Sequence, residues 1–386
     1  MASGGLDVLR NGATIVPGLL VHEWIESSGG AENVLEAMAK AFPDAGIQCL
    51  WNDAPTRFAG HRVRETWLAR TPLRRHKAAA LPLMLPTWRR LRADGEREWM
   101  LVSSHLFAHH ARLPGRDVPK FVYAHTPARY IWNPELDERG DHLVVRAVSP
   151  VLRRIDRRRA QEATSVAANS AFVRDRIRRA WDRDATVIHP PVAVERIVAQ
   201  ADWRTEVVDD AERRLLDTLP ETFVLGASRF VPYKRLDRVI LAAAGLGIPV
   251  VIAGSGPDTA PILAAKAIAA ARGVPARIVT APSTALLYAL MQRAAAFVFP
   301  AVEDFGIMPV EAQAAGTPVV TGPVGGQVET YTSGVSGVTA RSAEPAALAT
   351  AMERALALPP FDRRAVTARF SEDVFITRLH SFLPHA

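Results

Sequence analysis

The stretch FPAVEDFGIMPVE occupies residues 299–311 and indicates the fold of the second half of the chain. An apolar run ends at Pro300, a polar loop with Glu303 and Gly306 follows, and Pro309 suits the first turn of a helix. The order strand, loop, helix is the repeating unit of a parallel sheet covered by helices. Ligands bind such sheets at the carboxyl ends of the strands, so we expect a binding loop here.

Short apolar runs alternate with longer Ala-, Leu- and Arg-rich stretches on both sides of this segment. The predicted strands are Thr222–Ala227, Pro249–Ala253, Ala276–Val279, Ala296–Pro300 and Pro318–Thr321. The predicted helices are Arg235–Ala244, Ala260–Arg272, Thr284–Ala294 and Pro309–Ala315. Because the strands are continuously apolar, we expect a parallel sheet that is buried on both faces.

The first half repeats this pattern less clearly. Its candidate strands are Thr14–Val21, Ile47–Trp51, Trp99–Ser103, Lys120–Ala124 and Thr164–Ala168. The segment from about Val192 to Pro220 holds charged and helical residues and is the predicted linker region. We therefore predict an α/β protein of two doubly wound, Rossmann-like domains that face each other across a ligand-binding cleft. The predicted ranges are 1–195, 196–370 and a C-terminal helix, 371–386, that packs back on the first domain.

Composition narrows the class of protein only slightly. The 386 residues are 48% hydrophobic, which is a globular composition, and the formal net charge is +7. That charge favours an anionic partner but does not choose among nucleic acid, an acidic membrane and a phosphorylated small molecule. The single cysteine, Cys49, excludes an internal disulfide and is expected to be buried.

No secretory signal or membrane span is expected. The first apolar run, Ala13–Val21, is interrupted by Pro17 and Gly18, and no stretch approaches the roughly 20 apolar residues that span a bilayer. We expect the protein in the cytoplasm, and a peripheral contact with the inner face of the membrane is left open.

A second loop, GASRFVPYKRLD at residues 226–237, places two cations after a predicted strand. Arg229 can bind a diphosphate bidentately and Lys234 can act as a point charge, so a divalent metal is not required. Glu303 and Glu311, with seven residues between them, can each accept hydrogen bonds from sugar hydroxyls. Each of these side chains taken singly is an ordinary surface residue, and only the combination is informative.

Together the two loops resemble those of the retaining glycosyltransferase family 4, which has the GT-B fold. The resemblance extends over most of the chain. It includes the segments SGGAE (28–32), YAHTPARYIW (123–132), NSAFV (169–173), VIHPPV (187–192) and FSEDVF (370–375). The order and spacing of these motifs are more specific than any one of them.

The resemblance implies a role for each residue of the second domain. Arg229 and Lys234 would hold the donor diphosphate, and Glu311 would bind the ribose hydroxyls. Glu303 would contact hydroxyls of the transferred sugar, assisted by the backbone amides around Phe305, Gly306 and Ile307. The nucleobase would lie near Thr280 and Ala281, by position only.

In the first domain, the resemblance implies that Gly30 allows close approach of a loop to the phosphates. His125 would lie near the reacting sugar. Transfer would retain the anomeric configuration by a front-face mechanism, with domain closure excluding water. The motif Tyr123–Trp132 resembles a mannosyltransferase-like branch, so GDP-mannose is the first candidate donor, ahead of UDP-sugars. The acceptor would be a glycan or a polyprenyl-linked molecule.

Other functions remain open from the sequence. A sugar-nucleotide epimerase or a phosphorylase shares the GT-B fold, and a non-catalytic nucleic-acid-binding protein would explain the positive charge. No nucleic-acid motif is present, and the cations are dispersed, so we expect no nucleic-acid partner. Gly254-Ser255-Gly256 lacks the third glycine of a dinucleotide fingerprint. We interpret Asp182-Arg183-Asp184 as a turn and not as a metal site.

One segment suggests a membrane contact. Residues 71–92 mix six basic side chains with leucines, Met84 and Trp88. Such a mixture can rest on an anionic bilayer, where a lipid-linked acceptor would be presented. Pro82 and Pro86 argue against one long amphipathic helix, and a solvated face with core contacts is an equally good interpretation.

Overall fold

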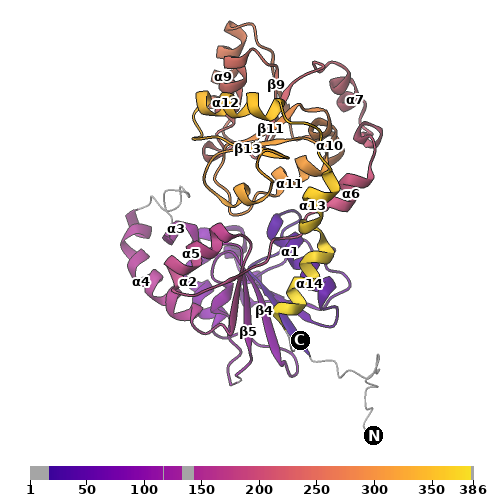
Figure 1. Cartoon of the computed structure of the whole chain (residues 1–386). Coiled ribbons are helices and arrows are strands. Elements are labelled where there is room, and N and C mark those ends of the chain that lie inside the picture. Colours follow the sequence, from indigo (N-terminus) through magenta and orange to yellow (C-terminus); the bar gives the residue numbers. More distant parts are fainter. Residues whose placement is uncertain (1–16, 116, 133–142, 384–386) are drawn as a thin grey trace. The chain divides into compact units, whose positions relative to one another are not determined.

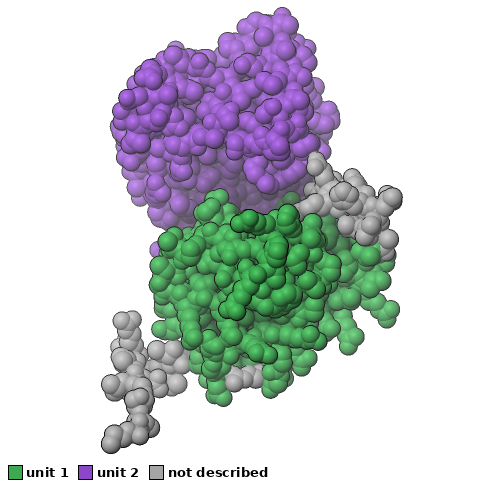
Figure 2. Space-filling model, turned by 180° about the vertical axis from the view of Figure 1, so that it is seen from behind, with its two compact units in different colours: residues 1–167, 177–186, 378–386 green, residues 168–176, 187–377 purple. Residues whose placement is uncertain are grey.

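The computed structural model describes residues 17–115, 117–132 and 143–383 and forms two compact units (Figures 1 and 2). Unit 1 is Met1–Ala167, Ile177–Thr186 and Arg378–Ala386, and unit 2 is Ala168–Arg176 and Val187–Thr377. The division is less linear than the predicted ranges. Helices α5 (Ala171–Trp181) and α14 (Glu372–Phe382) each contribute residues to both units.

The sheet of unit 1 has seven strands in the order β3-β2-β1-β4-β5-β6-β7, and the pairings from β3 to β5 are parallel. The strands are β1 (Gly18–His22), β2 (Gly46–Cys49), β3 (Val63–Glu65), β4 (Trp99–Ser104), β5 (Lys120–Ala124), β6 (Ser165–Ala168) and β7 (Thr186–Val187). The helices that precede α5 are α1 (Gly30–Ala41), α2 (Lys77–Trp88), α3 (Arg129–Trp132) and α4 (Leu143–Ala160).

The sheet of unit 2 has six parallel strands in the order β10-β9-β8-β11-β12-β13. The strands are β8 (Val224–Ala227), β9 (Val250–Gly254), β10 (Ala276–Thr280), β11 (Ala296–Phe299), β12 (Val319–Thr321) and β13 (Gly337–Thr339). The helices are α6 (Val194–Ala199), α7 (Asp210–Asp217), α8 (Leu236–Leu246), α9 (Ala260–Ala271), α10 (Thr284–Arg293), α11 (Ile307–Ala314), α12 (Pro345–Leu356) and α13 (Arg363–Thr367).

Two hydrophobic cores cover the two faces of the unit 2 sheet. Phe297 and Phe299 of β11 belong to the core that includes α10 and α11, whereas Ala296 and Val298 belong to the core that includes α8, α9 and α12. Successive residues of a strand point to opposite faces, so a strand buried on both faces must be apolar throughout. This confirms the predicted α/β fold of two doubly wound domains.

Both sheets reverse their strand order beside their first strand. In unit 1 the reversal lies between β1 and β4, and in unit 2 it lies between β8 and β11. At such a point the loops that follow the two strands diverge, because their helices cover opposite faces of the sheet. The loops after β1, β4, β8 and β11 are therefore the expected places for ligand binding.

The structure adds detail to two segments that were interpreted from the sequence. Residues 192–220, predicted as a linker region with helical residues, contain α6 and α7 and bury Trp203 and Leu216 in the core of unit 2. Helix α2 spans 12 residues and continues through Pro82 and Pro86, both of which are exposed. Cys49 is buried, as predicted. Among the described residues, no helix has the length and apolar character to cross a bilayer.

Candidate functional site

The loops after β8 and β11 meet through an ion pair between Lys234 and Glu303. We call residues 228–235 the β8 loop and residues 300–306 the β11 loop. The side chain of Lys234 is only 9% exposed and that of Glu303 is 20% exposed. The Lys234 ammonium also lies 5.0 Å from the ring centroid of Tyr233 and 5.5 Å from that of Phe299. The cation is thus held at the strand ends by one carboxylate and two aromatic faces.

Arg229 occupies the same loop but is exposed, and its guanidinium donates a hydrogen bond to the Tyr233 hydroxyl, with 3.1 Å between Nη2 and Oη. Tyr233 therefore contacts both cations of the β8 loop. The two cations differ in their setting, because Arg229 remains hydrated while Lys234 is largely shielded from water. A dianionic ligand at this loop would meet one exposed and one largely buried positive charge.

The glycines of Gly254-Ser255-Gly256 allow the loop after β9 to pack against the β8 loop. A Cβ atom at Gly254 would lie 1.8 Å from the carbonyl oxygen of Ser228, and one at Gly256 would lie 2.4 Å from that of Phe230. The backbone N–H of Phe230 donates to the carbonyl of Ser255 at 2.8 Å. These glycines therefore serve the packing of two loop backbones.

The β11 loop is hydrogen-bonded to the turn at residues 325–327. The backbone N–H of Gly326 donates to the Glu303 carbonyl at 2.8 Å, and the N–H of Glu303 donates to Oε1 of Gln327 at 3.1 Å. Gly306 has φ of 107°, and a Cβ there would lie 2.7 Å from the Cβ of Gln327. Glycine is needed at Gly306 for both its backbone conformation and its close contact.

Asp304, the neighbour of Glu303, anchors the β11 loop to the start of α5 within unit 2. Its Oδ1 lies 2.6 Å from Nη1 of Arg176, and both side chains are largely buried. The Ser170 hydroxyl donates to the Asp304 carbonyl at 2.5 Å. Asp304 therefore has a structural partner, whereas Glu303 is directed to the cation of the β8 loop. Although Asp304 and Glu303 are adjacent in the sequence, their side chains have different partners.

Glu329 holds the same end of α5. Its carboxylate accepts hydrogen bonds from the backbone N–H groups of Ala171 and Phe172, both at 2.8 Å. A carboxylate at a helix N-terminus satisfies free N–H donors and interacts favourably with the helix dipole. Although burial opposes ionisation, the pKa of Glu329 is lowered, because His189 and the two N–H groups stabilise the carboxylate.

Glu311 lies on α11 and is half-buried. Its Oε1 accepts a hydrogen bond from the Tyr288 hydroxyl of α10 at 3.0 Å. Burial raises the pKa of Glu311, and the Tyr288 hydrogen bond acts in the opposite direction. Tyr288 thus stabilises the ionised form, which accepts hydrogen bonds from hydroxyl groups with both oxygens.

Helix α11 begins directly after the β11 loop. Gly306 is its N-cap residue, and Ile307 is its first residue. Phe305 is 4% exposed and packs on Phe370 with 5.5 Å between ring centroids. Phe305 thus anchors the loop while the amides at the start of α11 remain the candidate donors to an anionic or hydroxyl ligand.

Thr280 and Ala281 lie at the carboxyl end of β10, which is the edge strand of the sheet. Both are exposed, and the N–H of Ala281 donates to the carbonyl of Gly254 at 2.8 Å. Ala281 adopts a left-handed conformation with φ of 49°, which is unusual for a residue other than glycine. This strand end therefore adjoins the loop after β9, which in turn adjoins the β8 loop.

His125 follows β5 in unit 1 and belongs to a chain of hydrogen bonds. Its Nε2 lies 2.9 Å from the Ser103 hydroxyl, and that hydroxyl lies 3.0 Å from Nδ1 of His22. Burial lowers the pKa of His125 to about 3 and that of His22 to about 4, with the nearby His105 acting in the same direction. Both imidazoles are therefore neutral at physiological pH, and Ser103 couples the position of their protons.

Glu23 was not predicted as a site residue, yet it organises the loop after β4. It is fully buried and accepts hydrogen bonds from the backbone N–H groups of Leu106 at 2.8 Å and Ala108 at 2.9 Å. Its Oε2 lies 3.3 Å from Nδ1 of His105. Burial opposes ionisation, but His105, His22 and the N–H donors together lower the pKa of Glu23. The structure thus keeps a carboxylate at the switch point of unit 1.

Gly30 is the first residue of α1 and is exposed. Its neighbour Gly29 is the more constrained of the two, because a Cβ there would lie 2.1 Å from Oε2 of Glu32. Glu32 is buried and accepts a hydrogen bond from the backbone N–H of Glu26 at 3.3 Å. Burial raises the pKa of Glu32. The loop that precedes α1 therefore packs against the buried carboxylate of Glu32.

The predicted site residues fall into separate groups in the structure. Lys234 and Glu303 are in contact, and Arg229 joins them through Tyr233. Gly30 and His125 belong to unit 1. Glu23, Ser103 and the partners of Asp304 were missed, because single polar residues next to apolar runs are common. Their only sequence signal was their position at strand ends beside the reversal of strand order.

One cluster in unit 1 has the residue types of a metal site. Among the described residues, His109, His110 and Asp156 alone bring three candidate ligand atoms together. Asp156 also accepts hydrogen bonds from the indole N–H groups of Trp132 at 2.7 Å and Trp181 at 2.6 Å. The pKa of Asp156 is lowered even though burial opposes ionisation. Both oxygens of Asp156 therefore have protein partners, Oδ1 with Nε2 of His110 at 3.0 Å and Oδ2 with the two indole N–H groups.

Two further predicted features have local partners. Asp184 lies 2.8 Å from Nη2 of Arg178 and accepts a hydrogen bond from the N–H of Ala185, within the bend between α5 and β7. In the segment 71–92, Arg74 pairs with Asp53 at 2.6 Å. The membrane contact of that segment stays a prediction.

Family models match both halves of the chain. The model described as "Glycosyltransferase Family 4" matches residues 28–196, and the one described as "Glycosyl transferases group 1" matches residues 209–370. These matches and the two Rossmann-like sheets place the chain in the GT-B fold class. The chain belongs to glycosyltransferase family 4.

Curated relatives resemble part of the chain. A D-inositol 3-phosphate glycosyltransferase of Salinispora tropica is 34% identical over 54% of this chain and 46% of its own length. A GDP-mannose-dependent alpha-(1-6)-phosphatidylinositol monomannoside mannosyltransferase of Mycolicibacterium smegmatis is 32% identical over 56% of this chain and 59% of its own length. The match thus spans about half the length of these relatives.

Solved structures resemble nearly the whole chain in fold. HepE of Anabaena, in complex with UDP and glucose, has a TM-score of 0.68 and 19% identity, covering 95% of this chain and 99% of its own. Sucrose-phosphate synthase of Thermosynechococcus elongatus has a TM-score of 0.66 and 17% identity, covering 96% of this chain and 98% of its own.

Proposed function

We propose that this protein transfers a hexose from a nucleotide-sugar donor to a glycan or lipid-linked acceptor, with retention of configuration. The observation that carries the proposal is the Lys234–Glu303 pair at the switch point of unit 2. A cation that can bind a diphosphate and a carboxylate that can bind sugar hydroxyls are thus placed side by side. A nucleotide sugar carries both groups a few bonds apart.

Each residue of the β8 and β11 loops has a proposed task. Lys234 and Arg229 bind the diphosphate and stabilise the charge that grows on it as the glycosidic bond breaks. Glu303 orients the sugar through its hydroxyls, and the amides at Phe305, Gly306 and Ile307 assist. Ionised Glu311, held by Tyr288, accepts hydrogen bonds from the ribose.

In unit 1, the proposed partners of the donor are Gly30 and His125. Neutral His125 can donate or accept one hydrogen bond at the reacting sugar, and Ser103 sets which ring nitrogen holds the proton. In the proposed front-face reaction, the bond from the anomeric carbon to phosphate breaks and the acceptor oxygen bonds on the same face. The acceptor proton passes to the leaving phosphate, so the diphosphate itself serves as the base.

GDP-mannose is the first proposed donor. The mannosyltransferase-like segment Tyr123–Trp132 supports it, as does the GDP-mannose-dependent relative. UDP-sugars are the second candidate, because HepE, which shares the fold, binds UDP and UDP-glucose. We also propose that no divalent metal is needed, since Arg229 and Lys234 offset the diphosphate charge. Full transfer rates in EDTA would support this, and strict dependence on Mg²⁺ or Mn²⁺ would contradict it.

The test of the proposed function is a thermal-shift panel of nucleotide sugars on the wild type, Lys234→Ala and Glu311→Ala. A ligand at about 100 times its dissociation constant stabilises the folded state by roughly 2.7 kcal/mol. We expect a shift that both variants lose, followed by transfer of the sugar with retention. If no nucleotide sugar or nucleoside diphosphate shifts the wild type, the proposal fails. Interconversion of the donor sugar without transfer would favour an epimerase instead.

A further inference from the structure

Basic side chains of unit 1 gather on two surfaces, one formed by residues 71–92 and one formed by α4. On the first surface, residues 71–92, three of the six cations form ion pairs, whereas Arg75, Arg90 and Arg92 are exposed and have no ion pair among the described residues. Lys77 lies 2.6 Å from Glu26, and Arg89 lies 2.5 Å from Glu162. Paired cations of this kind have little charge left for an external partner.

The second surface is formed by α4, and its cations are arranged differently. Arg153 and Arg157 donate to the carbonyls of Ile131 at 2.5 Å and Ala180 at 2.9 Å, and both guanidinium groups lie 5.6 Å from the centroid of the Trp132 ring. These acceptors are neutral carbonyls, and among the described residues no ion pair joins Arg153 or Arg157 to a carboxylate. In the part of the chain that the structure describes, Arg154 and Arg158 have no acidic partner and are exposed.

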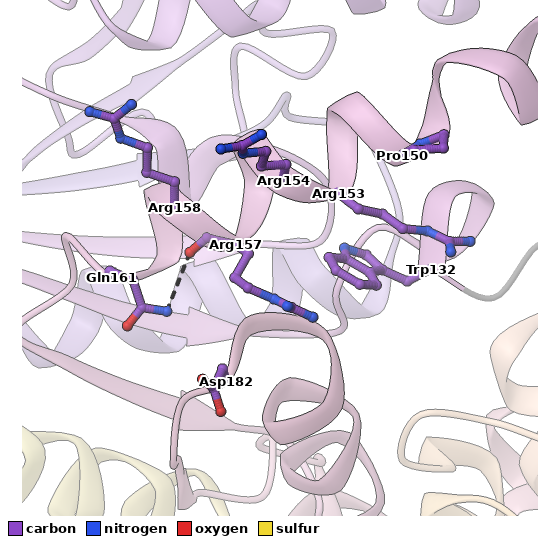
Figure 3. Close-up of a pocket in the computed structure, with 8 residues that line it drawn as sticks. All are labelled: Trp132, Pro150, Arg153, Arg154, Arg157, Arg158, Gln161 and Asp182. Atoms are coloured by element: carbon purple, nitrogen blue, oxygen red, sulfur yellow. Dashed lines mark hydrogen bonds between the residues drawn. The ribbon is translucent and has the colours of Figure 1, made fainter.

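These arginines line an open groove with a volume of about 600 Å³. Its lining residues are Trp132, Pro150, Arg153, Arg154, Arg157, Arg158, Gln161 and Asp182, all of unit 1. Figure 3 shows Arg153 and Arg157 beside Trp132, while Arg154 and Arg158 extend from α4 in another direction. Four arginines face one aspartate, so the groove is strongly cationic.

An exposed apolar ridge lies next to this groove on the same helix. Val148 is 43% exposed, Val151 is 64% exposed and Ile155 is 36% exposed. Their spacing of three and four residues places them on one face of the helix. Arg154 follows Val151 by three residues and Arg158 follows Ile155 by three, so the cations border the ridge. A water-exposed helix gains nothing from such a ridge unless a partner covers it.

We propose that this face of α4 docks on the surface of a bilayer that contains anionic phospholipids. The arginines bind lipid phosphates, and Val148, Val151 and Ile155 enter the interface beneath the headgroups. A soluble phosphate compound would need the groove but not the apolar ridge, whereas a bilayer surface accounts for both. The inference rests on unit 1 alone and is independent of the donor specificity.

The test is flotation of the full chain with two kinds of vesicle. One contains equal parts of phosphatidylglycerol and phosphatidylcholine, and the other contains phosphatidylcholine only. We expect salt-sensitive binding to the anionic vesicles alone. Because each basic side chain near an anionic surface strengthens binding roughly fivefold, Arg154→Glu with Arg158→Glu should lower binding at least twentyfold. Val151→Asp should also lower it, since an added carboxylate cannot enter the interface.

Arg90→Glu with Arg92→Glu is the matched control, because it changes the net charge equally on the other basic surface, where both residues are exposed. We expect this control to bind the anionic vesicles nearly as well as the wild type. If the control loses binding and the α4 variants keep it, the contact belongs to residues 71–92 and the inference about α4 is wrong. Absence of binding by the wild type also overturns it.

A second measurement separates docking from folding and from donor binding. The thermal shift produced by GDP and UDP should be the same in the wild type and in the α4 variants, because α4 is distant in sequence from the β8 and β11 loops. Inorganic phosphate at high concentration should not release the protein from vesicles. Complete release by phosphate, with Val151→Asp unaffected, would show that the groove binds a soluble phosphate and would overturn the bilayer assignment.

Discussion

Removing either partner of the Lys234–Glu303 pair should change nucleotide binding in opposite directions. Lys234 must release Glu303, at least in part, to bind a donor diphosphate. In Lys234→Ala the diphosphate loses a charge-assisted hydrogen bond, which contributes about 1.5–3 kcal/mol. The dissociation constant of GDP or UDP should therefore rise roughly 10- to 150-fold.

In Glu303→Gln the ammonium keeps a neutral neighbour and no longer has to exchange a carboxylate for phosphate. The pair is largely shielded, with side-chain exposures of 9% and 20%, so we take at least about 1 kcal/mol for this competition. A nucleoside diphosphate without sugar should thus bind roughly fivefold more tightly. Sugar transfer should still fall sharply, because the hydroxyl contacts of Glu303 are lost.

Isothermal titration calorimetry with GDP and UDP measures the nucleotide affinity of both variants. An assay of sugar transfer from the donor measures the loss of activity in Glu303→Gln. Glu344→Gln is the matched control, since it also removes one negative charge and one ion pair, with Arg238, in unit 2. Its nucleotide affinity should stay within about twofold of the wild type. If Glu303→Gln weakens nucleoside diphosphate binding as Lys234→Ala does, then Glu303 does not compete for the cation and the reasoning is refuted.

Further predictions concern stability and the shape of the loops. Burial lowers the pKa of His22 from its ordinary 6.5 to about 4. As the pH drops from 6.5 to 4, the unfolded chain takes up a proton at this histidine and the folded chain does not. The free energy of unfolding therefore falls over this range. Denaturant titrations at pH 7.5 and 5 should show a loss of roughly 2 kcal/mol from this group that His22→Gln lacks, and parallel losses would contradict it. Gly326→Ala should lower stability by about 1–3 kcal/mol and weaken donor binding, because its Cβ would lie 2.1 Å from a backbone carbonyl oxygen of the β11 loop. The control Gly245→Ala has open space and should be neutral or stabilising, so equal losses in the two variants would argue against this clash. Tyr288→Phe should raise the pKa of Glu311 further, so that nucleotide affinity is lost at a higher pH on acidification than in the wild type. The same pH dependence in both proteins would show that Tyr288 does not stabilise ionised Glu311.

The layered fold could be predicted from the sequence because its signals are local. A strand buried on both faces must be apolar at every residue, and β11 with Ala296, Phe297, Val298 and Phe299 meets that condition. The β8 and β11 loops could be recognised for the same reason, since each polar loop directly follows such a strand. The alternation of strands and helices then indicates parallel sheets without knowledge of their pairing.

The contacts within the candidate site required the tertiary structure. Lys234 and Glu303 are 69 residues apart, and only the parallel pairing of β8 with β11 brings their loops together. The same holds for Glu23, whose carboxylate meets N–H groups more than 80 residues away after β4. Sequence by itself determined which residues end the strands. The non-local strand order decided which of those ends are neighbours, and therefore which charges are paired, buried or free to bind a ligand.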